Sequence, residues 1–403
     1  MKRVEDLVIR DATDADIERV GQLSRISFNI PTSAVRSLPQ RYRPSRYLFA
    51  EDAGRVVATT LSHPMHQWFG GSPVPTSGIA GVTVDPVYRG TGVGSRLIGA
   101  MIRKQRDAGM VFSSLYPATV PVYRRLGYEY GGIQTKYRVP IAALPSGSPP
   151  LEARELTEHD DLEPMKACFR RIAATENGLV EGTEDDWWPN RVLSVIQEEA
   201  RGAVTVGSGS GSDAAEGYAA YVLEDIPDRW GYRVSCTHLM AETPDAARSL
   251  LAFFRRFRGV GMDLDWHGPP AEPLATLFGE QVVKPVFSFR MMARILDVAG
   301  ALEARGYPSG TEGEATFAVE DPLLTENRGR YRLEASDGKV RVERLDDDHA
   351  EGALAIGALS TLYTRYLSVP AAARVGLIGG DEPGLDLLGR LFAGPAPWLP
   401  DWF

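Results

Sequence analysis

The sequence predicts an α+β protein built from three successive units, and three observations carry this prediction. The chain has 403 residues, more than one hydrophobic core normally supports, so two or three domains are expected. Between residues 47 and 84, apolar strand-like runs alternate with short Gly-containing turns, a pattern typical of an antiparallel meander. A Pro- and Ser-rich stretch at 144–150 is typical of a linker, and helix and strand patterns begin again after it.

The first unit combines this meander with amphipathic helices. The stripe of Ile17, Val20 and Leu23, preceded by capping residues, predicts a helix near the start of the chain. A second helix is expected at 95–107, and Gly109 closes it. The remaining elements are expected as strands at 47–51, 56–61, 78–84, 111–115 and 129–139, with a short helix at 120–125.

The later units contain helix patterns of the same kind. In the second unit they fall at 162–174 and 243–257, the latter with Pro244 at its favoured first position. In the third unit they fall at 358–366 and 381–392, after a set of short strands. We therefore expect three domains, at residues 1–145, 146–288 and 289–403.

Composition limits the classes of function. The net charge of −9 argues against nucleic acid as a partner, because phosphate binding needs basic surface. Two cysteines, Cys168 and Cys236, form neither a disulfide framework nor a zinc-type cluster, and we expect no metal. The first residues lack an apolar signal-type segment, and no run approaches about 18 apolar residues. We expect a cytoplasmic protein without a membrane span.

A glycine-rich loop carries the clearest chemical signal. Strand residues 82–84 lead to the sequence Arg-Gly-Thr-Gly-Val-Gly-Ser at 89–95, which opens the predicted helix. Backbone N–H groups of such a loop, at a helix N-terminus, form an anion site suited to a pyrophosphate. The loop lacks the Gly-Lys-Ser/Thr of a P-loop, and an antiparallel meander is not the opening of a dinucleotide fold. The alternative is a tight strand-to-helix turn with no ligand.

This arrangement resembles the GNAT acyltransferase superfamily, whose acetyl-CoA motif R/Q-x-x-G-x-G/A is matched at 89–94. The resemblance implies that acetyl-CoA is the cosubstrate. Its pantetheine arm would pair with the backbone of 82–84, and its pyrophosphate would sit on the amides of 90–95. The residues implied to bind the cosubstrate here are Val82, Thr83, Val84, Arg89, Gly90, Thr91, Gly92, Val93, Gly94 and Ser95.

A second segment, Pro-Val-Tyr-Arg-Arg-Leu-Gly-Tyr at 121–128, resembles the GNAT segment that precedes the last strand. By this resemblance Tyr123 and Arg124 flank the CoA arm, and Tyr128 protonates the departing thiolate as general acid. A phenol with a pKa of about 10 within hydrogen-bond reach suits that step. Core packing is the alternative role for Tyr128, and Tyr130 and Tyr116 are rival acids.

The whole chain resembles the Eis (enhanced intracellular survival) acetyltransferases. Their order is a catalytic GNAT domain, a second GNAT-like domain and a sterol-carrier-protein-like domain, and the aromatic end of this chain, Trp-Leu-Pro-Asp-Trp-Phe at 398–403, fits that family. The resemblance implies that the terminal carboxylate of Phe403 enters the catalytic domain, that the protein forms a homo-oligomer, a hexamer, and that it acetylates aminoglycoside or lysine amines. Phe28 is expected either to line the acceptor pocket or to lie in the core.

The expected reaction is direct attack by an acceptor amine on the acetyl carbonyl, because no Cys or Ser stands in a nucleophile motif. An α-carboxylate is less basic than an amine by roughly 5–6 pKa units, about 7–8 kcal/mol. We therefore favour Phe403 as an ammonium anchor that passes the proton through water, over Phe403 as a direct base. The alternative functions are protein lysine acetylation and acyl-CoA binding without turnover.

Overall fold

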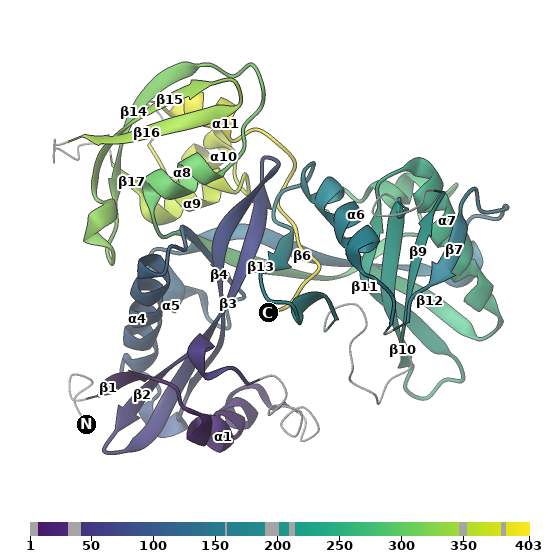
Figure 1. Ribbon diagram of the computed structural model, residues 1–403, viewed down its shortest axis with the longest axis horizontal. Coiled ribbons are helices and arrows are strands. Elements are labelled where there is room, and N and C mark those ends of the chain that lie inside the picture. The colour runs from purple at the N-terminus through teal and green to yellow at the C-terminus, as the bar shows by residue number, and fades with distance from the viewer. Residues whose placement is uncertain are drawn as a thin grey trace.

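Three units surround the middle of the molecule in Figure 1, and the C-terminus lies between them. The computed structural model describes residues 7–30, 42–157, 159–189, 201–208, 214–345, 353–379 and 384–403. Helices and strands alternate along all three units, which confirms the predicted α+β class.

The first unit is a curved sheet with helices against it. Helix α4 buries Leu97, Ile98, Met101 and Ile102, which confirms the predicted apolar face of this helix. Strand β3 extends well beyond the expected 56–61. The elements of this unit are β1 (Val8–Asp11), α1 (Ile17–Phe28), β2 (Tyr47–Asp52), β3 (Arg55–Phe69), β4 (Ser72–Val84), α4 (Val93–Asp107), β5 (Phe112–Leu115), α5 (Val120–Arg124) and β6 (Glu129–Pro140).

The second unit has the same build. Helix α7 buries its apolar face on strands β10 and β11, and helix α6 lies on the opposite face of that sheet. Its elements are β7 (Glu152–Glu155), α6 (Glu163–Ala173), β8 (Val180–Gly182), β9 (Arg201–Gly207), β10 (Gly217–Asp225), β11 (Tyr232–Ala241), α7 (Pro244–Arg255), β12 (Gly261–Gly268) and β13 (Lys284–Ile295).

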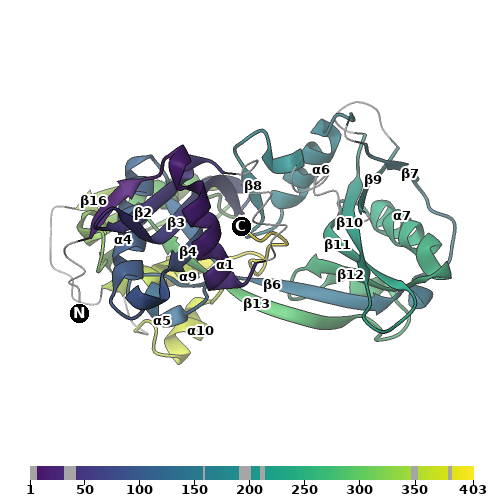
Figure 2. The ribbon, with the colours of Figure 1, turned by 90° about the horizontal axis from the view of Figure 1, so that it is seen from below.

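The two units share one continuous sheet. Among the described residues its strand order is β1-β2-β3-β4-β5-β13-β6-β12-β11-β10-β9-β7, with β8 added beside β3. Strand β13 therefore inserts between β5 and β6 of the first unit, and β6 also pairs with β12 of the second. Figure 2 shows β6 and β13 running side by side from one unit to the other. The expected domain boundary at 288/289 lies within β13.

The third unit packs against the shared sheet at strands β13, β6 and β4. Its small sheet has the order β16-β15-β14-β17. Arg294, at the end of β13, makes a fully buried ion pair with Asp321 of this unit, with N–O distances of 2.7 Å. Its elements are α8 (Val298–Ala304), β14 (Gly313–Glu320), β15 (Gly329–Ser336), β16 (Lys339–Leu345), β17 (Leu354–Ala355), α9 (Ile356–Tyr363), α10 (Val369–Arg374) and α11 (Leu385–Leu391).

Candidate active site

The glycine-rich loop ends in a helix start whose amides are not capped by a side chain. Gly90 and Gly92 have φ of 76° and 95°, values that residues with a Cβ rarely adopt. A Cβ at either position would meet no atom within 4 Å, so the loop is open to solvent there. Gly92 is the N-cap of α4, and no side chain among the described residues accepts from the first turn. The first amides of a helix have no partner within it, so these amides are available to an anion.

The corresponding helix of the second unit has a different start. The Thr243 hydroxyl caps α7 by accepting from the Ala246 amide at 3.1 Å, and Pro244 removes another donor. Asp245 adds a negative charge in the first turn. Of these two helices, only α4 therefore offers uncapped first-turn amides to an anion.

Strands β4 and β5 separate beside this loop. Their parallel pairing ends at Ile79 and Leu115, whereas β4 continues to Val84. On its other side β4 stays paired with β3, and the buried Thr83 hydroxyl is 2.7 Å from that of Thr59. The backbone of residues 82–84 is thus held from one side, and its other edge lies beyond the last pair with β5.

The connection from β4 to α4 is held by charged groups. The Asp85 carboxylate accepts from Arg19 at 2.7 Å and from Arg55 at 2.8 Å. It also accepts from the backbone amide of Val87 at 3.3 Å. Arg89 is exposed, and its Nε donates to the Val84 carbonyl at 3.2 Å. Arg89 therefore lies next to the two cosubstrate-binding segments predicted from the sequence.

The two tyrosines of the second signature have different surroundings. Tyr128 is fully buried, and burial raises the pKa of its phenol well above the usual range. Its hydroxyl is 2.8 Å from Ser113 Oγ, which donates to the Ser77 carbonyl at 2.9 Å. Tyr123 packs edge-on against Tyr128, with ring centroids 6.0 Å apart, and burial raises its pKa to about 12. The Tyr123 hydroxyl has no hydrogen-bond partner in the part of the chain that the structure describes.

Three further predicted residues, Arg124, Tyr130 and Phe28, have surroundings of their own. Arg124 makes a two-fold hydrogen bond with Glu129, at 2.7 and 2.8 Å. Its guanidinium also lies over the Tyr130 ring, which in turn contacts Tyr366 of the third unit. Phe28 is the last residue of α1 and is 48% exposed, so it is not a core residue.

The C-terminal segment is fixed by contacts with both GNAT-like units. Gln134 of β6 donates to the Pro400 carbonyl at 2.7 Å, and the Tyr116 hydroxyl donates to the Asp401 carbonyl at 2.7 Å. His238 of β11 lies 3.1 Å from the Asp401 carboxylate, and both side chains are buried. Tyr218 is 3.0 Å from the other ring nitrogen of His238. The Tyr218–His238–Asp401 chain thus ties the tail to the second unit.

The last residue of the chain meets the first unit. A Cβ at Gly78 of β4 would lie 2.9 Å from the Phe403 ring. The same ring is 5.5 Å from that of Tyr116, which directly follows β5. Phe403 therefore lies where β4 and β5 end their pairing.

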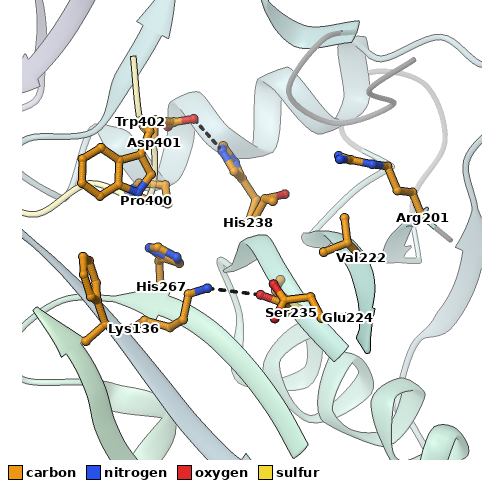
Figure 3. A pocket seen from close by; sticks show the side chains of 13 residues that line it. Lys136, Arg201, Val222, Glu224, Ser235, His238, His267, Pro400, Asp401 and Trp402 are labelled. Atoms are coloured by element: carbon orange, nitrogen blue, oxygen red, sulfur yellow. Dashed lines mark hydrogen bonds and ion pairs between the residues drawn. The ribbon is translucent and has the colours of Figure 1, made fainter. Parts of the chain in front are cut away.

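A cavity of about 470 Å³ lies on the other side of the tail, on the concave face of the second unit's sheet (Figure 3). Pro400, Asp401 and Trp402 form one wall. The floor is formed by side chains from β6, β11 and β12, and Figure 3 shows Lys136 directed toward Ser235 there.

Sequence reasoning missed the polar residues of this cavity, although a signal was present. In β12 Asp263, Asp265 and His267 alternate with Met262, Leu264 and Trp266, and Lys136 and Arg138 alternate in the same way in β6. Alternation with period two puts such residues on one face of a sheet. Strands with polar residues on one face and apolar residues on the other therefore indicated a polar surface on this part of the sheet.

Comparisons with known proteins agree with this arrangement. Models of an acetyltransferase (GNAT) domain match residues 8–131 and 183–295, and a model of a sterol carrier protein domain matches residues 298–400. An uncharacterized N-acetyltransferase of Streptomyces avermitilis is 25% identical over 431 residues, covering 100% of both chains. The GCN5-related N-acetyltransferase of Anabaena variabilis is 26% identical, with a TM-score of 0.90 over 98% of this chain and 100% of that one.

The solved structure of Eis1 from Mycobacterium abscessus has the same fold. It is 22% identical, with a TM-score of 0.78 over 98% of this chain and 100% of that chain. The chain is a member of the GNAT N-acetyltransferase family, and it has the fold of Eis1. The predicted order of two GNAT-type domains and a sterol-carrier-type domain is confirmed. This GNAT-family protein has, in its described residues, no helix with the length and apolar character needed to cross a bilayer.

Proposed function

We propose that this Eis-like enzyme moves the acetyl group of acetyl-CoA to a primary amine, in a single active site in its first domain. The observation that carries this proposal is the meeting of Phe403 with Gly78 and Tyr116, beside the opening between β4 and β5. The chain's own carboxylate is thereby brought to the domain with the uncapped glycine loop. The second domain's capped helix α7 supports a single site.

The first domain fits a CoA thioester. Gly90 and Gly92 leave an open surface at the start of α4, suited to the pyrophosphate, and Arg89 adds a positive charge nearby. The free edge of residues 82–84 offers backbone groups for an amide-containing arm. Bound there, acetyl-CoA supplies an activated acyl group. Thr91 Oγ1 donates to the Tyr88 carbonyl at 2.7 Å and so holds the loop in its conformation.

Phe403 acts on the acceptor. Its carboxylate holds the acceptor's ammonium, and the proton leaves through water, because direct transfer to a carboxylate is uphill by about 7–8 kcal/mol. The neutral amine then forms a C–N bond with the carbonyl carbon as the C–S bond breaks. The nitrogen loses a second proton to solvent, and the sulfur gains one from a general acid. The products are an N-acetyl amide and a free thiol.

Two tyrosines compete for the general acid. Tyr128 is the acid predicted from the sequence. However, Ser113 uses its single proton on the Ser77 carbonyl, so the proton of Tyr128 is directed to Ser113. Tyr123 also carries a phenol hydroxyl, and no acceptor among the described residues takes its proton in a hydrogen bond. The geometry therefore favours Tyr123 as the donor and Tyr128 as its buried support.

The acceptor class follows from the anchor. A carboxylate at the reacting end favours an acceptor whose reacting amine is protonated, and the candidate classes are polyamines, aminoglycosides and lysine side chains. Thiol release from acetyl-CoA, measured with a panel of these amines and with lysine-containing proteins, tests the function. We expect amine-dependent release with the N-acetylated amine detected by mass spectrometry. Thiol release that does not depend on any amine would contradict the proposal. Turnover with protein acceptors alone would show that the acceptor is a protein lysine and not a small molecule.

A further inference from the structure

The cavity behind the tail is large enough for a ligand and has no assigned role. Its volume of about 470 Å³ lies within the range of small-molecule sites, roughly 300–1,000 Å³. It is formed between the second domain's sheet and residues 400–402. It lies outside the glycine loop and the tyrosine segment, so the CoA-binding elements do not account for it.

The cavity is adjacent to the C-terminal residue that we propose binds the acceptor. Trp402 lines it, and Phe403, whose ring lies against Gly78 and Tyr116, is the next residue. Neighbouring Cα atoms are about 3.8 Å apart. A molecule with its amine at the Phe403 carboxylate can therefore extend past Trp402 into this cavity.

Both carboxylates that line the cavity have a basic side chain beside them. Asp401 is paired with His238, and Glu224 lies 3.6 Å from Arg233. Lys136, in contrast, contacts only the neutral Ser235 hydroxyl, at 3.3 Å, and it has no carboxylate within ion-pair distance among the described residues. Arg201 adds a second cation to the lining. The cavity therefore presents a half-buried ammonium that lacks a counter-charge.

His267 adds a buried polar atom without a partner. The residue is 7% exposed and stands directly opposite Lys136 in the β6–β12 pair. Its Nδ1 is buried and makes no hydrogen bond within the described part of the chain. Burial, with Lys136 nearby, lowers the pKa of His267 to about 3. The ring is therefore neutral and offers hydrogen bonding to a ligand without adding charge.

We propose that this cavity binds an oxyanion, a carboxylate or a phosphate, at the far end of the acceptor, with Lys136 as its counter-ion. This inference rests on the proposed amine acetylation and narrows its acceptor class. The preferred acceptor is a primary amine that carries an oxyanion at its opposite end. A polyamine without an oxyanion would bring a cation toward Lys136 and is disfavoured.

Four acceptors of equal chain length test the preference. They are an ω-amino acid, an aminoalkyl phosphate, the neutral amino alcohol and the diamine, each assayed over a series of chain lengths. We expect kcat/KM for one of the two oxyanion compounds to exceed that of the amino alcohol about tenfold, with the diamine lowest. The two oxyanion compounds distinguish a carboxylate from a phosphate ligand.

Variants of Lys136 connect the preference to the cavity. Lys136→Met should remove the oxyanion advantage through KM, Lys136→Arg should retain it, and Lys136→Glu should make the diamine the better acceptor. Lys339→Met, on the exposed edge of β16 in the third domain, is the control for the loss of one positive charge and should change nothing. Calorimetric titration of the ω-amino acid into the CoA-bound protein gives a readout independent of turnover, and retained CoA binding shows that each variant is folded.

The outcomes separate this inference from the function on which it rests. Equal kcat/KM for all four acceptors, or a preference that survives Lys136→Met, overturns the oxyanion site and leaves amine acetylation standing. A diamine preferred by the unaltered protein does the same. If none of the four acceptors nor any aminoglycoside is acetylated, and the ω-amino acid does not bind, both proposals fail.

Discussion

Tyr123 and Tyr128 differ in what their hydroxyls contact, and this difference can be measured. We expect Tyr123→Phe to lower kcat by about 10²-fold or more, the usual effect of losing a general acid, with little change in CoA affinity. Tyr128→Phe should instead lower the thermal midpoint, because it removes the buried hydrogen bond with Ser113. Steady-state kinetics and thermal unfolding of both variants decide the assignment. The opposite pattern would restore Tyr128 as the acid.

Gly92 offers a matched test of the CoA loop. Gly92 and Gly109 stand at the two ends of α4, with φ of 95° and 87°, and a Cβ at either would meet no neighbour within 4 Å. Alanine should therefore cost each variant a similar backbone strain, about 1–2 kcal/mol. We expect only Gly92→Ala to weaken CoA binding in a calorimetric titration. Equal weakening by Gly109→Ala would mean that α4, and not the loop, carries the effect.

His267 makes the stability of the fold depend on pH. Burial, followed by the charge of Lys136, lowers its pKa from 6.5 to about 3. The unfolded chain thus binds a proton between these values while the folded protein does not. The free energy of unfolding has the full contribution of the neutral His267 above pH 6.5. This contribution falls as the pH decreases from there through about 3, by on the order of a few kcal/mol in total.

Thermal unfolding at about pH 7 and about pH 4.5 tests this dependence. We expect His267→Gln to lose less stability than the unaltered protein on acidification, because glutamine does not titrate. The same loss in both proteins would show that other groups determine the acid sensitivity.

At the scale of elements, sequence patterns predicted local structure well and pairing poorly. The apolar stripe of α4 and the glycine loop before it lie close together in the chain, so periodicity and turn chemistry predicted them. The insertion of β13 between β5 and β6 depends on residues far apart in the chain, and no local pattern encodes it. Strand β3 was expected to end at Leu61 but continues to Phe69, because Pro64 is accommodated in the strand opposite Ser77.

The same reasoning explains what was predicted at the site. The cosubstrate residues form one short motif, and the role of Phe403 was implied by the resemblance of the aromatic segment 398–403 to a known family. His238, Asp401 and Lys136 could not be associated with one another from sequence, since they meet only through the shared sheet and the tail. The alternation of polar and apolar residues in β6 and β12 indicated a polar face that includes Lys136, but not the residues that meet it there.

Substitution of Asn177 tests how the C-terminal segment is held against the first two domains. Its side chain accepts from the Gly70 amide at 2.8 Å and donates to the Pro395 carbonyl at 2.9 Å, while its own carbonyl accepts from Trp398. Asn177→Ala removes both of these part-buried hydrogen bonds, each worth about 1 kcal/mol. We expect a lower thermal midpoint and a lower kcat/KM, with CoA affinity retained. Unchanged kinetics would show that the tail needs no such anchor.

At the scale of the whole molecule, Arg294 and Asp321 connect the shared sheet to the third domain. Both side chains have no exposed surface. Arg294→Met should therefore destabilise the protein by about 3–5 kcal/mol, since it leaves Asp321 as an uncompensated buried charge. The double variant with Asp321→Asn should recover part of that loss. Urea unfolding of the single and double variants checks this, and equal destabilisation by both would argue against a charge effect.

The tail links all three domains, because it leaves the third, contacts the second at His238 and ends in the first at Gly78. The central claim is that this route delivers the Phe403 carboxylate to the acceptor amine. A chain that ends at Trp402, and a chain extended by one glycine after Phe403, both displace that carboxylate. Phe403→Ala keeps the carboxylate and removes the ring.

The most direct test is the amine-dependent turnover of these three variants at saturating acetyl-CoA, with CoA affinity measured in parallel. We expect deletion and extension each to lower kcat/KM for the amine by about 10²-fold, as for a displaced catalytic group, with unchanged CoA affinity. Phe403→Ala should lower kcat/KM for the amine by a smaller factor, because it keeps the carboxylate. Full turnover in both the shortened and the extended chain would contradict the account and leave the C-terminus with a packing role.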